Sequence, residues 1–330
     1  MTSYTRTFRL LALLCFLVVL CSPFWGMSAI SPFSLFESGS PDAEVFWRLR
    51  LPRTVAAFLV GAGLAVSGMV FQAMFRNPLA TPFTLGVSSG AAFGASVYFR
   101  LGTALSILGS TGSLGAALIG GAFSMLLVYL ITRAKGGFST PVMLLAGVII
   151  NFFFSSLVMF IQYLSNANDS LRIMHWLMGS LTGVEVARLA ELTFIVVAGA
   201  AVLFRFSLEL DLLAGGDELA ASRGVSVRKV KITAFAVASI IVGGVVSLAG
   251  PIGFVGMMVP HICRLRFGWN HTRLLPASFL FGGCFLVLCD LLARSLLAPA
   301  EIPIGIITAL IGGPFFLWTL FSANRGGEFY

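Results

Sequence analysis

Long apolar runs separated by short polar stretches make up most of this 330-residue chain. An α-helix needs about 20 mainly apolar residues to cross the hydrocarbon core of a bilayer. With an even number of crossings, both termini lie on the same side of the membrane. The pattern predicts ten membrane-spanning helices, at 10–27, 52–75, 83–101, 115–132, 141–164, 189–206, 232–249, 252–262, 274–297 and 302–321.

One interval breaks this pattern, from Phe206 to Ile232. Its charged residues keep it out of the bilayer and in water, and they are Glu209, Asp211, Asp217, Glu218, Arg223, Arg228, Lys229 and Lys231. Acidic residues favour a helix start and glycine favours a helix end, so DELAASRG at 217–224 is predicted to be a short helix. The alternative is a solvated connector with a single helical turn.

Composition assigns the fold class. Hydrophobic residues make up 58% of the chain and charged residues 10%, with a mean hydropathy of +0.98, outside the range of soluble domains. The prediction is therefore an all-α polytopic membrane protein with one transmembrane domain over 1–330. Five cysteines without metal-ligand spacing are expected to be apolar packing residues. The chain contains no GxxxxGK[ST] sequence, so hydrolysis of ATP through a P-loop of its own is not expected.

The charges also predict an orientation. If the N-terminus lies inside, the inside segments hold 14 basic and 5 acidic residues, and the outside segments hold 7 and 8. That asymmetry agrees with the positive-inside rule, so the basic balance reflects topology and does not indicate a nucleic-acid partner. The first run is predicted to be a retained helix, and a cleaved secretory signal is the alternative.

The two halves of the chain resemble each other. VGAGLAVSG at 60–68 and VGGVVSLAG at 242–250 lie in the second and seventh predicted helices, which the ten-helix order places in opposite directions. This predicts an inverted repeat of helices 2–5 and 7–10, which is typical of transporters. Spaced small residues, such as Gly61 with Ala65 and Gly90 with Gly94, predict close helix packing. The expected segments are the first helix and its connector at 1–50, the first repeat at 51–164, the sixth helix at 189–206, the polar loop at 207–231 and the second repeat at 232–322.

Six motifs occur in a fixed order, namely RLPRTVAAFLVGAGLAVSG, RNPLATP, LGVSSGAAFG, GDELAASRGV, GFVGMMVPHICR and AEIPIG. Together they resemble the FecCD-type permease subunits of binding-protein-dependent ABC importers for iron siderophores, haem and cobalamin. The resemblance covers nearly the whole chain. It implies a bacterial inner-membrane protein with both termini in the cytoplasm.

The resemblance also implies partners. A FecCD-type permease pairs with a second copy or a close paralogue, with the pore between them, and receives cargo from a periplasmic binding protein. Two ATPase subunits carry the ATP and Mg²⁺, so no cofactor or metal is expected on this chain. The polar loop resembles the helix that couples the permease to the ATPase, through Asp217, Glu218, Ala220, Arg223 and Gly224.

Two further sets of residues match the family. Arg50 and Arg294 resemble outer arginines that meet the binding protein, although each has a structural alternative, and Asp290 lies one turn before Arg294. The predicted cytoplasmic gate consists of Asn77, Leu79, Ser139 and Thr140. Asn77 has the alternative role of a helix cap. Pro141 departs from the serine expected in the cobalamin branch.

Cargo and mechanism have alternatives. Ferric siderophore is the first expectation for the cargo because it is the commonest in the family, and cobalamin or haem is the alternative. His261 is expected to have a structural role, because no second ligand lies at helical spacing. A structural role is also expected for His175 on the outer face, and contact with haem or a siderophore is the alternative. An ion-coupled secondary transporter would also contain inverted repeats, but it normally needs ionisable groups at mid-membrane. No catalytic residues are expected, since the spans lack paired carboxylates.

Overall fold

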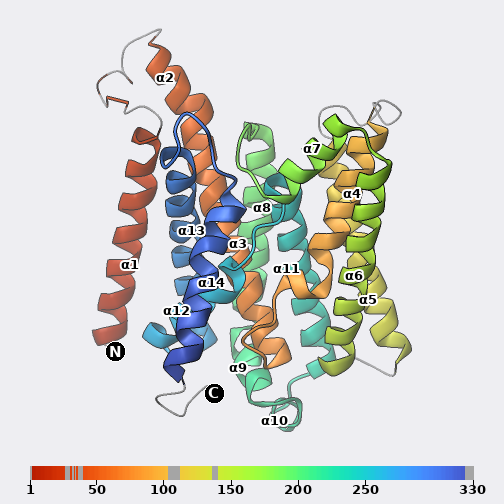
Figure 1. Ribbon diagram of the computed structural model, residues 1–330. Coiled ribbons are helices and arrows are strands. Elements are labelled where there is room, and N and C mark those ends of the chain that lie inside the picture. Colours follow the sequence, from red (N-terminus) through yellow and green to blue (C-terminus); the bar gives the residue numbers. More distant parts are fainter. Residues whose placement is uncertain are drawn as a thin grey trace.

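The computed structural model describes residues 2–26, 30–31, 33, 35, 40–102, 112–135 and 140–323. Over these residues the chain consists of helices, turns and irregular segments, and no strand occurs among them. The prediction of an all-α membrane protein is confirmed (Figure 1).

Eight helices of the described chain are long and apolar enough to cross a membrane. They are α1 (Thr2–Cys21), α3 (Leu51–Phe75), α5 (Gly112–Ala134), α6 (Thr140–Leu164), α8 (Val186–Arg205), α11 (Val227–Ala249), α13 (His271–Ser295) and α14 (Ile304–Ala323). The other two predicted runs form shorter helices, α4 (Val87–Leu101) and α12 (Val255–Phe267), of 15 and 13 residues.

Local breaks explain why these two helices are short. The chain leaves α3 through a turn and a 3-10 helix, η4 (Pro82–Leu85), and Gly86 then adopts φ 79° before α4 begins. In the second half, Gly250 adopts φ 69° and Phe254 φ 67° before α12 begins. Positive φ values interrupt a helix, so some residues of each apolar run form the connecting segment before the helix and do not belong to the helix itself.

The two short helices occupy corresponding places. In Figure 1, α3 descends and α4 returns upward, whereas α11 rises and α12 turns downward. The same reversal relates α5 and α6 to α13 and α14. Helix order and direction thus follow the predicted inverted repeat. Paired short helices in the two halves of a transporter commonly mark the region of the substrate path.

Helix α3 lies at the centre of the molecule. Its membrane-length window is 89% buried, and it packs against α8, α11, α12 and α13. A methyl group at Gly61 would overlap the backbone carbonyl of Gly282, and one at Gly68 would overlap that of Gly256. The prediction that small residues let these helices approach closely is confirmed.

The outer helices expose apolar side chains. The membrane-length windows of α1, α5, α6, α8 and α14 are only 17–28% buried, so most of their surface is available to lipid or to a partner chain. All five cysteines are free, and only Cys21 is exposed. The buried cysteines act as small packing residues, as their spacing predicted.

Short helices lie at the two ends of the bundle. They are η1 (Ser22–Phe24), α2 (Pro41–Val45), η3 (Phe46–Arg50), α7 (Ala167–Leu177), α9 (Ser207–Gly215) and α10 (Asp217–Ser222). In Figure 1, α2 and α7 lie at one end, and α9 and α10 lie at the other. Helix α1 begins and α14 finishes at the same end as α10.

Candidate functional site

The polar loop folds into two helices, α9 and α10, which we call the α9–α10 element. Gly216 joins them with φ 126° and ψ 152°, a conformation that is essentially restricted to glycine. A Cβ atom at this position would lie 3.5 Å from Nη1 of Arg76, the residue that follows α3. The element therefore bends sharply beside the C-terminal end of α3.

Helix α10 starts at Asp217, where the sequence predicted a helix start. Nζ of Lys231, on α11, donates a hydrogen bond to Oδ2 of Asp217 at 2.6 Å, and the Lys231 side chain is buried. Ala220 is fully buried among Leu213 and Val230. Of the five residues predicted to couple to an ATPase, Asp217 and Ala220 thus hold α10 against the bundle.

The other predicted coupling residues face outward. Glu218, Arg223 and Gly224 are exposed, and Gly224 adopts φ 83° just after the helix, as a glycine at a helix C-terminus often does. The chain thus presents one acidic and one basic side chain on the outer surface of a short anchored helix. This arrangement can contact a partner protein without unfolding.

A second contact ties α9 to the bundle. Oδ1 of Asp211 accepts a hydrogen bond from the backbone N–H of His271 at 2.8 Å and lies 2.5 Å from Nδ1 of the same residue. His271 is the first residue of α13 and is 3% exposed. No sequence pattern points to this pair, because 60 residues separate its members.

Three of the predicted gate residues lie at the end of the bundle where α10 lies, since Asn77 and Leu79 follow α3 and Thr140 begins α6 (Figure 1). Oδ1 of Asn77 accepts a hydrogen bond from the backbone N–H of Leu79 at 2.9 Å, so its side chain stabilises the turn after α3. The C-terminal cap of α3 itself is Arg76, which adopts φ 49°. Leu79 is 56% exposed, and Thr140 is the half-buried first residue of α6. Ser139 lies outside the described residues.

The two predicted docking arginines have different surroundings. Nη1 of Arg50 donates to the carbonyl oxygens of Pro23 and Phe24 at 3.2 and 3.3 Å, and the residue stays half-buried. Arg294 is only 4% exposed, and its Nη2 donates to the carbonyl and the hydroxyl oxygens of Ser22, each at 2.8 Å. In this structure Arg294 offers little surface to a docking protein.

Arg294 belongs instead to a charge cluster around the buried Asp290. Arg53 donates from Nε to Asp290 at 2.9 Å and from Nη1 to Glu301 at 2.9 Å. Nε of Arg294 lies 3.6 Å from the other oxygen of Asp290. We call these four residues the outer charge cluster. In the sequence, the spacing of Asp290 and Arg294 was the one signal of a charge cluster.

The histidines considered as ligands lie apart. The ring of His261 contacts those of Phe315 and Phe316, with centroids 5.9 and 6.5 Å away. His175 is exposed in the last turn of α7. Within the described ranges, no three side chains of histidine, cysteine, aspartate or glutamate are arranged to hold a metal ion.

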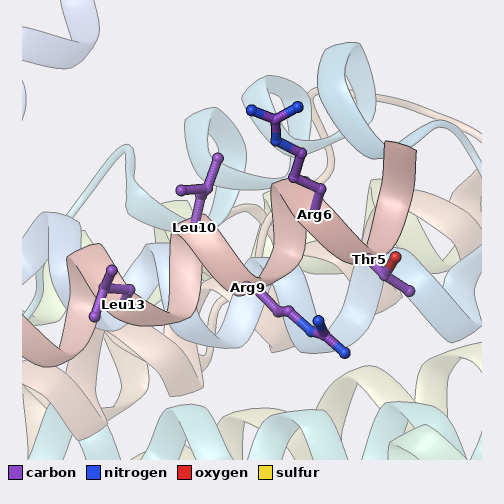
Figure 2. Close-up of a pocket in the computed structure, with 5 residues that line it drawn as sticks. All are labelled: Thr5, Arg6, Arg9, Leu10 and Leu13. Atoms are coloured by element: carbon purple, nitrogen blue, oxygen red, sulfur yellow. The ribbon is translucent and has the colours of Figure 1, made fainter. Parts of the chain in front are cut away.

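A shallow hollow of about 330 Å³ lies along the N-terminal half of α1. Thr5, Arg6, Arg9, Leu10 and Leu13 line it, and all five belong to the exposed face of the helix (Figure 2). Arginines followed by leucines along one helix face are typical of a helix entering the bilayer from its basic side. The hollow faces outward from the bundle, so it is not part of a path between the repeats.

Comparisons with known proteins agree over the whole chain. The sequence profile of the FecCD transport family matches residues 11–322. The vitamin B12 import system permease protein BtuC of Escherichia coli O157:H7 is 40% identical over 316 residues, covering 96% of this chain and 94% of BtuC. The hemin transport system permease protein HmuU of Yersinia pestis is 36% identical over 313 residues, covering 94% of this chain and 93% of HmuU.

A solved structure is similar as well. A metal-chelate type ABC transporter in an inward-facing conformation matches with a TM-score of 0.87 and 33% identity, over 96% of this chain and 99% of the other. The similarity in sequence and in helix arrangement therefore extends over both repeats and the α9–α10 element.

Proposed function

Since the chain belongs to the FecCD transport family, as its motifs predicted, we propose that it receives a metal chelate from a periplasmic binding protein and releases it inward. It is a permease of the ABC importer type that serves metal chelates, vitamin B12 or haem. The observation that carries the proposal is the α9–α10 element, a short charged helix anchored to the bundle at one end of two inverted repeats.

The α9–α10 element suits a connection to an ATPase. Its inner side is fixed through Ala220 and the Asp217–Lys231 ion pair, and its outer side presents Glu218 and Arg223. A partner that pushes on α10 would move α11 through that ion pair. The chain has no P-loop sequence, so ATP and Mg²⁺ would bind to two ATPase subunits beneath a permease dimer.

The outer and inner ends would have different tasks. Arg50 lies at the outer end, and a rim charge of this kind steers a docking partner and sets its orientation. Asn77 and Leu79 lie in the turn after α3, next to Arg76 and Gly216 of the element, and Thr140 begins α6. A gate at the inner end would respond to movement of the element. We propose the inner membrane as the location, with both termini and α10 in the cytoplasm.

For the cargo, ferric siderophore is proposed first and cobalamin or haem second. The relatives named above carry vitamin B12 and hemin by name, so both alternatives have support. A chelated cargo does not require metal ligands from the permease, which fits the separation of His175 and His261. Measuring what the cognate binding protein binds would identify the cargo.

Reconstituted uptake tests the proposal. Liposomes containing this permease, its partner ATPase and its binding protein should accumulate cargo only with ATP and Mg²⁺. Glu218→Lys should lower the cargo moved per ATP hydrolysed by about fivefold or more, because it reverses a charge on the contact surface. Asp217 is less suitable for this test, because replacing it also removes the ion-pair partner of the buried Lys231.

A matched variant controls for nonspecific effects. Glu191→Lys reverses an exposed charge near the start of α8, away from α10, and should leave the uptake ratio unchanged. Uptake driven by an ion gradient without the ATPase would show that the proposed function is wrong and would favour a secondary transporter.

A further inference from the structure

Helix α13 connects the α9–α10 element to the outer end of the molecule. It runs without a break from His271 to Ser295, and Pro276 lies within its second turn. At a rise of about 1.5 Å per residue, the 19 residues from His271 to Asp290 span about 28 Å. One helix therefore reaches from the Asp211–His271 contact to the outer charge cluster.

The inner contact is strong for a single pair of residues. Asp211 accepts from the first backbone N–H of α13 and from the imidazole of the same residue, at 2.8 and 2.5 Å. Hydrogen bonds to an ionised carboxylate are stronger than neutral ones, and a negative charge at a helix N-terminus is favoured by the helix dipole. Movement of α9 is thus transmitted directly to the end of α13.

At position 271, histidine stabilises the packing less than an apolar residue would. His271 is 3% exposed, and its Nε2 is a buried atom without a hydrogen-bond partner in the described part of the chain. A leucine of similar size would fill the space without leaving a buried polar atom unpaired. The benefit of His271 therefore lies in its bond to Asp211.

The outer end of α13 is tied to the docking region. Arg294, on α13, donates to Ser22, and Arg50, the proposed docking residue, donates to the next two carbonyl groups of the same segment. Asp290, one turn earlier, is paired with Arg53 of α3. A binding protein that moves Arg50 or the Ser22–Phe24 segment would therefore also move α13, through the hydrogen bonds of Arg294 to Ser22.

We infer that Asp211 and His271 are positioning residues that join the α9–α10 element to α13, and that α13 links binding-protein docking outside with ATP hydrolysis inside. The inference rests on the proposed function and deepens it. The Asp211–His271 contact connects the α9–α10 element to α13. It is a second connection to the bundle, besides the Asp217–Lys231 ion pair that connects the element to α11.

The test uses the complete complex of permease, ATPase and binding protein in liposomes. The readout is the ratio of ATP hydrolysis with the cargo-free binding protein to hydrolysis without it. His271→Leu should lower this ratio about fivefold or more, which is the lower range of coupling between two sites. His271→Asn should restore most of it, because its amide can donate to Asp211 as Nδ1 does.

A control separates the link from the stability of α13. Oδ1 of Asn270 accepts from the backbone N–H and the hydroxyl of Thr272, so both side-chain hydrogen bonds of Asn270 in the described chain stay within the first turn of α13. Asn270→Ala therefore removes the helix's own cap and should leave the stimulation ratio at the wild-type value. A merely structural role of His271 would make the Asn270 and His271 variants behave alike.

Four outcomes would contradict the inference. Wild-type stimulation in His271→Leu, or a failure of His271→Asn to restore it, would show that the link is absent while the proposed function stands. If His271→Leu does not assemble, Asp211→Asn tests the link in its place, because this substitution keeps the side-chain shape and removes the charge. Full stimulation of ATP hydrolysis in Asp211→Asn would show that the link is absent. A wild-type complex that transports without ATP would remove the proposed function and this inference with it.

Discussion

Arg53 and Arg48 form the same kind of ion pair in different surroundings. The side chains of Arg53 and Asp290 are 14% and 1% exposed, whereas those of Arg48 and Glu44 are 77% and 64% exposed. Removing one partner of a buried pair leaves an uncompensated charge, but an exposed charge remains hydrated.

The two arginines should therefore differ in their effect on stability. Arg53→Met is expected to lower the free energy of unfolding by about 3–5 kcal/mol. Arg48→Met should change it by at most about 1 kcal/mol. Chemical unfolding of the protein in detergent measures both, and equal losses would show that the outer charge cluster does not stabilise the fold.

Two glycines on facing helices allow a similar comparison of packing. A methyl group at Gly94 would overlap the carbonyl of Ala116, whereas one at Gly115 would meet nothing within 4 Å. Gly94→Ala should cost about 1–3 kcal/mol, because α4 and α5 would have to separate. Gly115→Ala should be neutral or stabilising by about 0.5–1 kcal/mol, as alanine favours a helix.

Thermal unfolding in detergent would compare these variants directly. A fall in the midpoint temperature for Gly94→Ala alone would support the close packing of α4 and α5. The same fall in both variants would contradict it.

Sequence patterns predicted which glycines pack helices together but not which charges are buried. Small residues at spacing four indicate a close approach whatever the partner helix is. The surroundings of Arg53 depend on α13 and on the segment before α14, which lie more than 230 residues away. No local pattern carries that information.

At the scale of elements, the bend at Gly216 separates α9 from α10. Gly216→Ala should cost about 1–3 kcal/mol in backbone strain, since alanine avoids φ 126° with ψ 152°. The strain would shift α10 and lower the cargo moved per ATP hydrolysed. Gly215→Ala is the matched control, because its methyl group would meet only the flexible end of Leu219.

The expected result is reduced uptake per ATP in Gly216→Ala and normal uptake in Gly215→Ala, with equal amounts of both proteins in the membrane. Normal uptake in both variants would show that the position of α10 tolerates the change. It would also weaken the proposed coupling role of the α9–α10 element.

Helix boundaries were predicted well where local chemistry sets them. Asp217 starts α10 as expected, and Gly224 follows its end. The lengths of α4 and α12 were less predictable, because apolar residues continue through the breaks that precede both helices. Hydropathy does not distinguish an apolar helix from an apolar connection.

At the scale of the whole molecule, orientation can be tested by chemical labelling. Ser222 on α10 and Asn168 on α7 are exposed at opposite ends. In a background with Cys21→Ser, a membrane-impermeant maleimide should label Asn168→Cys in spheroplasts and Ser222→Cys only in inverted vesicles, because basic residues favour the cytoplasmic side.

Labelling of Ser222→Cys in spheroplasts would contradict the predicted orientation. It would also place the α9–α10 element out of reach of a cytoplasmic ATPase. The buried cysteines serve as an internal control, since they should react in neither preparation.

The sequence alone determined the fold class, the inverted repeat and the family, because these depend on hydropathy, charge asymmetry and ordered motifs along the chain. Only the tertiary structure showed that Arg294 is buried, that Arg53 joins Asp290 to Glu301, and that Asp211 holds His271. These properties arise where helices from distant parts of the chain meet. Whether a charged side chain is buried, and which residue it pairs with, depend on the helices that pack around it. The residue type alone does not specify those neighbours.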